Sequence, residues 1–190
     1  MRRQFSLFQS HLDLAHSYWA RLVRPGDTVI DATCGNGHDT LQLAQLVGAK
    51  GVVYAYDIQE QAIAQSKTLL EKHEVAGRIR WSCQSHEDFG QIPPTRLIVF
   101  NLGYLPGSDK TLTTLTISTL ASIRRGMDIL MAGGAMSITA YPGHPEGANE
   151  EAALWLFLKE LSPLKWNSTY HQWPNRKKAP SLFFLQKARC

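Results

Sequence analysis

The residues best suited to chemistry begin with the stretch DATCGNGHDT, residues 31–40, which follows the apolar run TVI. Gly35 and Gly37 allow the chain to turn sharply from a strand into a helix and let a ligand approach the backbone. The helix that follows has free N–H groups in its first turn. This spacing predicts a site that holds part of a nucleotide-like cofactor.

An acid in the next apolar stretch, GVVYAYDI, strengthens this prediction. Asp57 lies about twenty residues after Gly37, where a carboxylate can accept hydrogen bonds from ribose hydroxyls. The structural alternatives are that Asp31 only caps the turn and that Asp57 only caps the next helix. The predicted cofactor-binding residues in this loop and at this strand end are Asp31, Thr33, Gly35, Asn36, Gly37, Asp57 and Ile58.

The loop pattern also discriminates between two cofactor classes. A dinucleotide site usually has G-x-G-x-x-G, whose third glycine permits close packing of helix and strand, but Thr40 stands at that position here. Asp31 would repel a pyrophosphate, whereas it would favour the cationic amino-acid end of S-adenosylmethionine. The pattern D-x-x-x-G-x-G therefore favours S-adenosylmethionine and resembles the first motif of class I methyltransferases. A nucleotide-linked oxidoreductase is the disfavoured alternative.

Two later loops are expected beside the same cofactor. In QSHEDF, after the third apolar stretch, Ser85 and His86 either touch the edge of an adenine ring or form a polar turn. Asn101, at the end of the fourth apolar stretch, is also assigned to the cofactor site. Side chains that follow neighbouring parallel strands meet at one edge of a sheet, which is where such a ligand binds.

The second set of chemistry-bearing residues lies in NLGYLPG, residues 101–107. The spacing Asn101-x-x-Tyr104 resembles the [D/N]-P-P-[Y/F] motif of amino-methyltransferases, although Leu102 and Gly103 replace the two prolines. An asparagine carbonyl can hold the N–H groups of an amine and aim its lone pair, and an aromatic ring can pack on the acceptor base. The alternative is that Asn101 only ends the strand and Tyr104 packs in the core.

An aliphatic amine acceptor would first have to lose a proton. His144, in YPGHPEG, could receive this proton or could be an ordinary polar loop residue. The predicted catalytic residues are therefore Asn101, Tyr104 and His144. No metal site is predicted, because the other histidines lack the spacing of metal ligands. We interpret each of these as a surface or packing residue: His11, His16, His38, His73 and His171.

The stretch YHQWPNRKKAP, residues 170–180, interleaves aromatic and basic side chains. Trp173 could stack on a splayed base, while Arg176, Lys177 and Lys178 could contact phosphates. A hairpin with a solvated basic tip would have the same composition. The formal charge of +4 is compatible with an anionic partner such as nucleic acid but is shared by many unrelated proteins.

The elements that must position these residues alternate along the chain. Strands are expected at 28–34, 51–58, 78–83, 96–103 and 133–141, and helices at 6–23, 38–47, 60–73, 111–127 and 149–161. Two final strands, 165–173 and 180–188, have no helix between them, so one should be inserted antiparallel near the sheet edge. The alternation predicts an α/β fold, a mostly parallel Rossmann-like sheet with helices on both faces.

Composition limits the class of protein. With 190 residues, 44% of them hydrophobic and 19% charged, the chain fits a single globular domain, 1–190, with a helical lead-in over about residues 1–24. Three cysteines without C-x-x-C spacing support neither a disulfide framework nor a zinc site. No segment approaches the roughly 20 apolar residues of a membrane span, and the N-terminus lacks the apolar core of a signal peptide. We expect a cytoplasmic protein, or an organellar one in a plant, although no clear transit peptide is visible.

Four stretches taken together, IDATCGNGHDT, NLGYLPG, YPGHPEG and WPNRKKAP, resemble the bacterial rRNA methylases of the YtqB-like family, which has relatives in plants. The resemblance spans nearly the whole chain and implies a class I methyltransferase. Some members, of the MnmM type, methylate the aminomethyl group of 5-aminomethyl-2-thiouridine at the tRNA wobble position. The resemblance further implies the anticodon stem-loop of tRNA as partner, and pairing as homodimers.

The same resemblance implies roles for individual residues. Asp31, Gly35, Gly37 and Asp57 would bind S-adenosylmethionine, Asn101 and Tyr104 would flank the acceptor, and His144 would lie nearby. Three alternatives stay open: an rRNA methyltransferase, a small-amine N-methyltransferase, and an RNA-binding module that keeps the fold without catalysis.

Overall fold

A computed structural model describes residues 10–103 and 114–189. The helices are α1 (His11–Leu22), α2 (His38–Val47), α3 (Glu60–Lys72), α4 (Thr116–Ile129) and α5 (Pro145–Lys159), with a short 3-10 turn, η1 (Ala76–Arg78). The strands are β1 (Thr28–Asp31), β2 (Val52–Asp57), β3 (Ile79–Cys83), β4 (Thr95–Asn101), β5 (Leu130–Ala140), β6 (Trp166–His171) and β7 (Ser181–Lys187). These elements confirm the predicted alternation of strands and helices.

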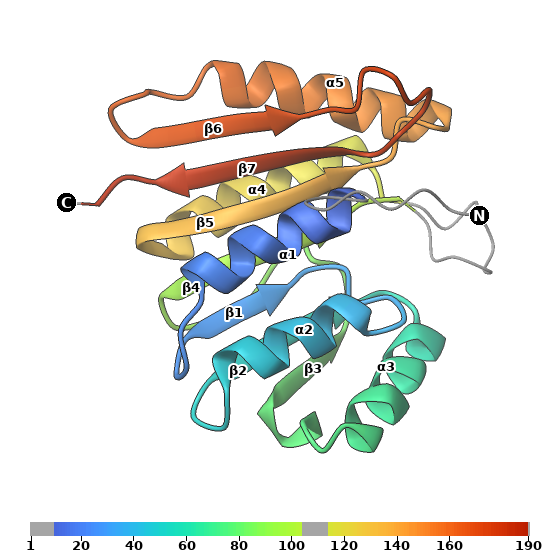
Figure 1. Ribbon diagram of the computed structural model, residues 1–190, viewed down its shortest axis with the longest axis vertical. Helices are drawn as coiled ribbons and strands as arrows, with labels where there is room; N and C mark the ends of the chain where they lie inside the picture. Colours follow the sequence, from blue (N-terminus) through green and yellow to red (C-terminus); the bar gives the residue numbers. More distant parts are fainter. Residues whose placement is uncertain (1–9, 104–113, 190) are drawn as a thin grey trace.

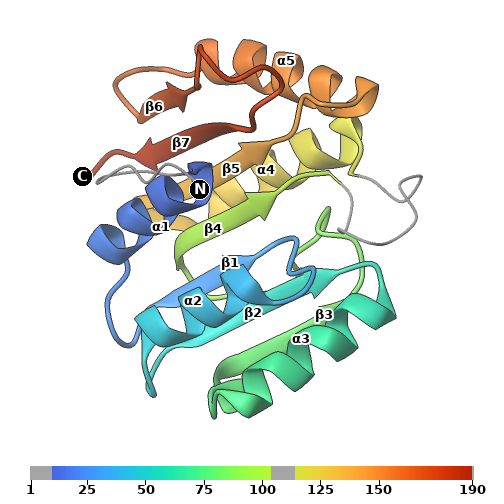
Figure 2. The same ribbon diagram turned by 45° about the vertical axis from the view of Figure 1, so that its right-hand side comes forward.

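The seven strands form one sheet in the order β3-β2-β1-β4-β5-β7-β6 (Figures 1 and 2). The first five strands are parallel to their neighbours, whereas β7 runs antiparallel to both β5 and β6. The expected insertion of one antiparallel strand near the sheet edge is therefore confirmed. Because β7 separates them, β6 runs in the same direction as β5.

One edge of this sheet collects the carboxyl ends of β1 to β6 and is called the carboxyl edge below. Asp31, Asp57 and Asn101 end β1, β2 and β4 there. The turn between β6 and β7 lies at the same edge, because His171 at the end of β6 pairs with Leu182 near the start of β7. The sheet thus brings together three motifs that lie far apart in the sequence.

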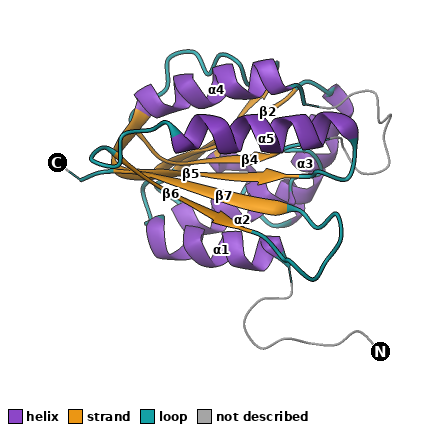
Figure 3. Ribbon diagram, turned by 90° about the horizontal axis from the view of Figure 1, so that it is seen from above, coloured by secondary structure: helices purple, strands orange, loops and turns teal. Residues whose placement is uncertain are grey.

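Helices α1, α2 and α3 cover one face of the sheet, and α4 and α5 cover the other (Figure 3). Alternate residues of β4 show how both faces are buried: Leu97 and Val99 join the core under α1–α3, while Ile98 and Phe100 join the core under α4 and α5. Each such side chain stabilises the fold by roughly 1.5–3 kcal/mol when fully buried. A continuous apolar run is typical of a strand covered on both sides.

Several element boundaries differ from the sequence-based ones. The predicted helix at 149–161 begins earlier, because His144 caps it and a proline occupies its first turn. The first strand ends at Asp31, since residues 32–34 already turn away from it. β5 begins at Leu130, before the pair of glycines where we expected it. Residues 6–9 and 111–113 of two predicted helices lie outside the described residues.

Within residues 10–103 and 114–189, no helix combines the length and the apolar character needed to cross a membrane. Two cysteines in this part of the chain are free thiols, Cys34 buried and Cys83 exposed.

Candidate active site

The glycine turn after β1 depends on both conformation and packing. Gly35 has a φ of 49° and Gly37, the N-cap of α2, a φ of 84°, a region that L-residues with side chains seldom adopt. A Cβ on Gly37 would lie 2.8 Å from the Ser66 hydroxyl of α3. That hydroxyl donates to the Gly35 carbonyl at 2.7 Å. A larger residue at Gly37 would therefore push the loop away from α3.

Asp57 joins this turn to the end of β2. Its carboxylate accepts the Gly35 N–H and the Gln59 N–H, each at 2.9 Å. A carboxylate has about four lone pairs, so it retains capacity for further donors. The next residue, Ile58, is 55% exposed, which is unusual for an isoleucine. An acid beside an exposed apolar side chain suits a ribose and its base.

Asp31, which was expected to face the cationic end of the cofactor, is fully buried. It accepts the Thr40 hydroxyl at 2.6 Å and the Thr33 N–H at 3.2 Å. Burial, reinforced by the nearby charge of Asp39, raises the pKa of Asp31 to about 7. Its observed contacts hold the loop against α2, and its contact with a cofactor stays a prediction.

Asp39, in the first turn of α2, is a site residue that the sequence reasoning missed. It accepts the side-chain N–H of Asn101 at 3.2 Å and contacts His16 Nε2 at 2.9 Å. Its side chain is only 11% exposed. A carboxylate can only accept hydrogen bonds, so it must face the amide nitrogen of Asn101. The amide oxygen then points elsewhere, and it is buried with no hydrogen-bond partner among the described residues.

The backbone of Asn101 is fixed as firmly as its side chain. Its N–H donates to the Thr33 hydroxyl of the glycine turn at 2.7 Å. Pairing with β5 continues one residue further, since the Leu102 N–H bonds the Thr139 carbonyl at 2.9 Å. Gly103 then turns with a φ of 113°. Tyr104, the second residue of the predicted acceptor motif, lies outside the described residues.

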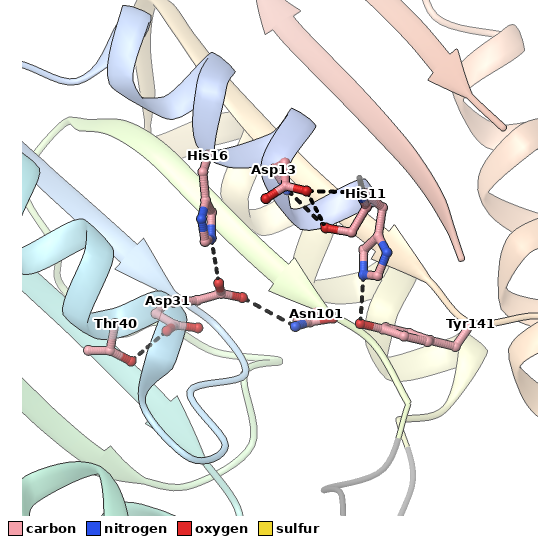
Figure 4. A network of polar contacts seen from close by, with 9 residues as sticks. His11, Asp13, His16, Asp31, Thr40, Asn101 and Tyr141 are labelled. Carbon is pink, nitrogen blue, oxygen red and sulfur yellow. Dashed lines mark hydrogen bonds and ion pairs between the residues drawn. The ribbon is translucent and has the colours of Figure 1, made fainter. Parts of the chain in front are cut away.

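Two histidines of α1 complete the polar network around Asn101 (Figure 4). His16 contacts Asp39, and His11 Nε2 lies 3.0 Å from the Tyr141 hydroxyl just after β5. Burial raises the pKa of Tyr141 to about 12 and lowers the pKa of His11. The interpretation of His11 and His16 as packing residues fits their ring contacts with Tyr141 and Trp19, but the sequence did not indicate their polar contacts.

His144 lies near the acceptor motif but has a structural task. Its Nδ1 accepts the Gly147 N–H at 3.1 Å and so caps α5. Its Nε2 would be 4.0 Å from a Cβ placed on Gly103. The structure therefore brings His144 to the predicted acceptor strand end, while its role in receiving a proton stays a prediction.

The loop after β3 shows a polar turn and a packed histidine. Ser85 accepts the Glu87 N–H at 3.2 Å. His86 is 8% exposed, its ring meets Phe100 edge-on, and burial lowers its pKa to about 4. A neutral, packed imidazole supports the loop, and contact of either residue with an adenine stays a prediction.

The β6–β7 turn carries the predicted RNA-binding residues to the carboxyl edge. Trp173 is half-buried and packs against the core under α1–α3. The Arg176 guanidinium lies 5.7 Å from the centre of the Trp173 ring, and Lys177 and Lys178 are exposed. The tryptophan is thus partly a core residue, and the cations are the more accessible part of this turn.

These residues fit S-adenosylmethionine and not a metal. The glycine turn, the anchored Asp57 with exposed Ile58, and the carboxylate of Asp39 offer partners for a ribose, a base and a cationic amino-acid end. Among the residues described, no group of three or more His, Cys, Asp or Glu side chains could hold a metal ion.

Comparison with known proteins identifies the family of this chain. The family described as "Putative rRNA methylase" matches residues 53–187. A crystal structure of a "putative rRNA-methylase" from Clostridium thermocellum superimposes with a TM-score of 0.92 at 33% identity, covering 95% of this chain and 98% of that one. The chain belongs to this methylase family.

Two other relatives of this methylase support its cofactor. A "putative methyltransferase" from Streptococcus mutans, crystallised with SAH, shares 30% identity with a TM-score of 0.85, covering 95% of this chain and 99% of that one. A curated protein of Arabidopsis thaliana, "tRNA (mnm(5)s(2)U34)-methyltransferase, chloroplastic", is 39% identical over 189 residues, 92% of this chain and 68% of its own length. The methylase described here is a class I, S-adenosylmethionine-dependent methyltransferase.

Proposed function

We propose that this methylase modifies RNA, and that its acceptor is the aminomethyl nitrogen of 5-aminomethyl-2-thiouridine at the wobble position of tRNA. The name of the Arabidopsis relative refers to this wobble-uridine modification. A protein 39% identical over nearly the whole chain is the strongest available support for the substrate. The geometry of Asn101 supports the class of acceptor.

The observation that carries the proposal is the orientation of the Asn101 carboxamide. Asp39 holds its nitrogen, so its buried oxygen is left to accept an N–H from the acceptor. A primary amine has N–H groups to donate and a lone pair to aim, which an Asn carbonyl can position. S-adenosylmethionine, when bound, supplies an electrophilic methyl group. Asn101 would hold the acceptor, while the turn at Gly35 and Asp57 would hold the donor.

RNA would be recruited at the same edge. The exposed cations Lys177 and Lys178 can contact phosphates of an anticodon stem-loop, with Arg176 stacked on Trp173 behind them. We also propose that residues 1–190 act as one domain, in the cytoplasm where tRNA is available, and that two copies pair. The exposed apolar side chain of Trp155, on α5 beside the edge strand β6, supports such a pairing surface.

Nucleoside mass spectrometry tests the substrate directly. Transfer RNA that carries 5-aminomethyl-2-thiouridine is incubated with the protein and S-adenosylmethionine, and its nucleosides are measured. We expect 5-methylaminomethyl-2-thiouridine to appear, and Asn101→Ala to lower kcat by about 100-fold while cofactor affinity is unchanged. Wild-type protein that binds the cofactor but leaves this nucleoside unmethylated would refute the proposed substrate.

A second candidate substrate is rRNA, which the family description favours. The same assay with undermodified ribosomal RNA, and with free alkylamines, separates the candidates. Methylation of rRNA or of a free amine, with none of tRNA, would replace the tRNA proposal by the corresponding alternative.

A further inference from the structure

The proposed acceptor is an alkyl ammonium ion at neutral pH, since such groups have a pKa near 10. It must lose one proton before its nitrogen can attack a methyl group. His144 is poorly arranged to take this proton, because its Nδ1 accepts the Gly147 N–H. A neutral imidazole has one acceptor nitrogen, so Nε2 carries the hydrogen when Nδ1 accepts.

A histidine–tyrosine contact lies beside the Asn101 carboxamide. Tyr141 follows β5 as Asn101 ends β4, and these strands are neighbours in the sheet. Burial raises the pKa of Tyr141 while the Asn101 side chain lowers it, so the amide N–H end of Asn101 faces the phenol oxygen. On its far side, the Tyr141 hydroxyl lies 3.0 Å from His11 Nε2 (Figure 4). The phenol therefore lies between the Asn101 carboxamide, which we propose holds the amine, and an imidazole on α1.

We propose that Tyr141 and His11 together receive the proton that the acceptor ammonium loses, an inference that rests on the proposed function. The ammonium N–H bond breaks as the Tyr141 oxygen takes its proton, and Tyr141 passes its own hydrogen to His11 Nε2. The phenol ends unchanged, the amine becomes neutral and the imidazole becomes imidazolium. The positive charge moves from substrate to histidine, and no other reactant is needed.

The charged groups around His11 suit this exchange. Burial lowers the pKa of His11, so the imidazole is neutral and able to accept at neutral pH. Asp13 on α1 and Asp39 on α2 are close enough to favour the imidazolium once it forms, while His16 on α1 opposes it. Burial keeps Tyr141 protonated, with a pKa of about 12, so it can relay a proton without storing charge.

The first test needs no RNA. In protein labelled with ¹⁵N-histidine, NMR reports which ring nitrogen of His11 carries the hydrogen. We expect a bare Nε2 that accepts from Tyr141 at neutral pH, with its chemical shift changed by Tyr141→Phe. A protonated Nε2 in the wild-type protein would overturn the proposal whatever the substrate is.

The second test is the pH profile of kcat with the tRNA substrate. Tyr141→Phe and His11→Gln should each lower kcat by about 100-fold at neutral pH. The loss of kcat should shrink as the pH approaches the pKa of the substrate amine, because the substrate then binds in its deprotonated form. A loss of equal size at every pH, or none, would show that the pair only docks α1.

A matched control exists on the same helix. The Tyr18 hydroxyl lies 3.1 Å from His171 Nε2, the same kind of contact made to β6. His171→Gln should leave the shape of the pH profile unchanged. Thermal melts of all variants test whether unfolding causes any loss of kcat. If the wild-type protein methylates no tRNA, the proposed function is refuted. The NMR result still decides whether His11 Nε2 can accept a proton from Tyr141.

Discussion

The carboxamide of Asn101 has a donor end and an acceptor end, and its contact with Asp39 leaves the acceptor end for the proposed substrate. This contact crosses 62 residues of sequence, from the start of α2 to the end of β4. The local sequence does not indicate this contact, because an acid such as Asp39 is common in the first turn of a helix. The motif residue was predictable, but the residue that orients it was not.

We predict that Asp39→Ala lowers kcat by about 10-fold to 100-fold, because a misplaced Asn101 oxygen would no longer aim the proposed amine acceptor. Asp39→Asn should retain more activity than Asp39→Ala, since its own carbonyl can still accept the Asn101 N–H. Steady-state kinetics on tRNA measures both. Equal loss in the two variants would show that the charge of Asp39 matters and not its orientation of Asn101.

For Asp57, we predict that substitution by alanine weakens binding of S-adenosylmethionine by at least about 10-fold. The change removes the proposed partner of the ribose and also the acceptor of the Gly35 N–H. Isothermal titration calorimetry measures the affinity. Glu71→Ala, an exposed acid on α3, is the control and should bind normally. Unchanged affinity of the Asp57 variant would refute its place in the cofactor site.

The buried carboxyl of Asp31 predicts a pH-dependent stability. Its pKa is raised in the fold to about 7, so the stability it contributes is complete below the unfolded value near 3.8 and is lost as the pH rises through about 7. The free energy of unfolding of wild-type protein should therefore fall relative to that of Asp31→Asn between about pH 4 and about pH 7, by up to a few kcal/mol. Urea denaturation measures this difference. The exposed Asp128→Asn should show no such trend.

At the scale of elements, local signals located most helices and strands. Helix α2 has the predicted bounds because glycines stand at both ends, Gly37 as N-cap and Gly48 as C-cap, with φ values of 84° and 66°. Helix α5 was placed four residues late, although Pro145 in its first turn was an available signal. The position of α1 over the site could not be predicted, since it depends on tertiary packing of Trp19 and its neighbours.

The contact between the glycine turn and α3 yields a further prediction. Gly37→Ala should destabilise the protein by about 1–3 kcal/mol, because the residue must keep a positive φ and its Cβ meets Ser66. It should also weaken cofactor binding, since the turn would move away from α3. Gly77→Ala is the control, because a Cβ there meets nothing within 4 Å. Thermal melts with and without cofactor measure both effects, and a normal melt for Gly37→Ala would contradict the packing argument.

At the scale of the whole molecule, three features lie at the carboxyl edge of the sheet. They are the glycine turn after β1, the end of β4 at Asn101, and the β6–β7 turn. Parallel strand direction alone predicted the first two together. The third arrived there because β7 is inserted between β5 and β6, which returns the end of β6 to that edge. Because no helix separates the last two strands in the sequence, we predicted an antiparallel strand. The sequence did not predict which residues would lie with Asn101 at the carboxyl edge.

This arrangement predicts that RNA binding depends on the β6–β7 turn. Reversing the charges of Arg176, Lys177 and Lys178 to glutamate should raise the KM for RNA and lower the slope of its salt dependence by about one for each lost phosphate contact. The matched control reverses Lys50, Lys72 and Lys165, which are exposed at the opposite edge of the sheet. Filter binding at several salt concentrations distinguishes the two triple variants. Equal behaviour would leave the turn as ordinary solvated surface.

The insertion of β7 also constrains the order in which the fold can form during synthesis. β6 precedes β7 in the chain, yet among residues 10–103 and 114–189 it pairs only with β7, so it cannot join the sheet first. Until residues 181–187 leave the ribosome, β5 keeps one row of backbone groups unpaired, next to apolar side chains such as Met136 and Ile138. The cofactor half, β1 to β4, can close earlier, because all its strands are already present. The nascent chain therefore passes through a stage at which the glycine turn can be complete while an open β5 edge is exposed to aggregation and to chaperones.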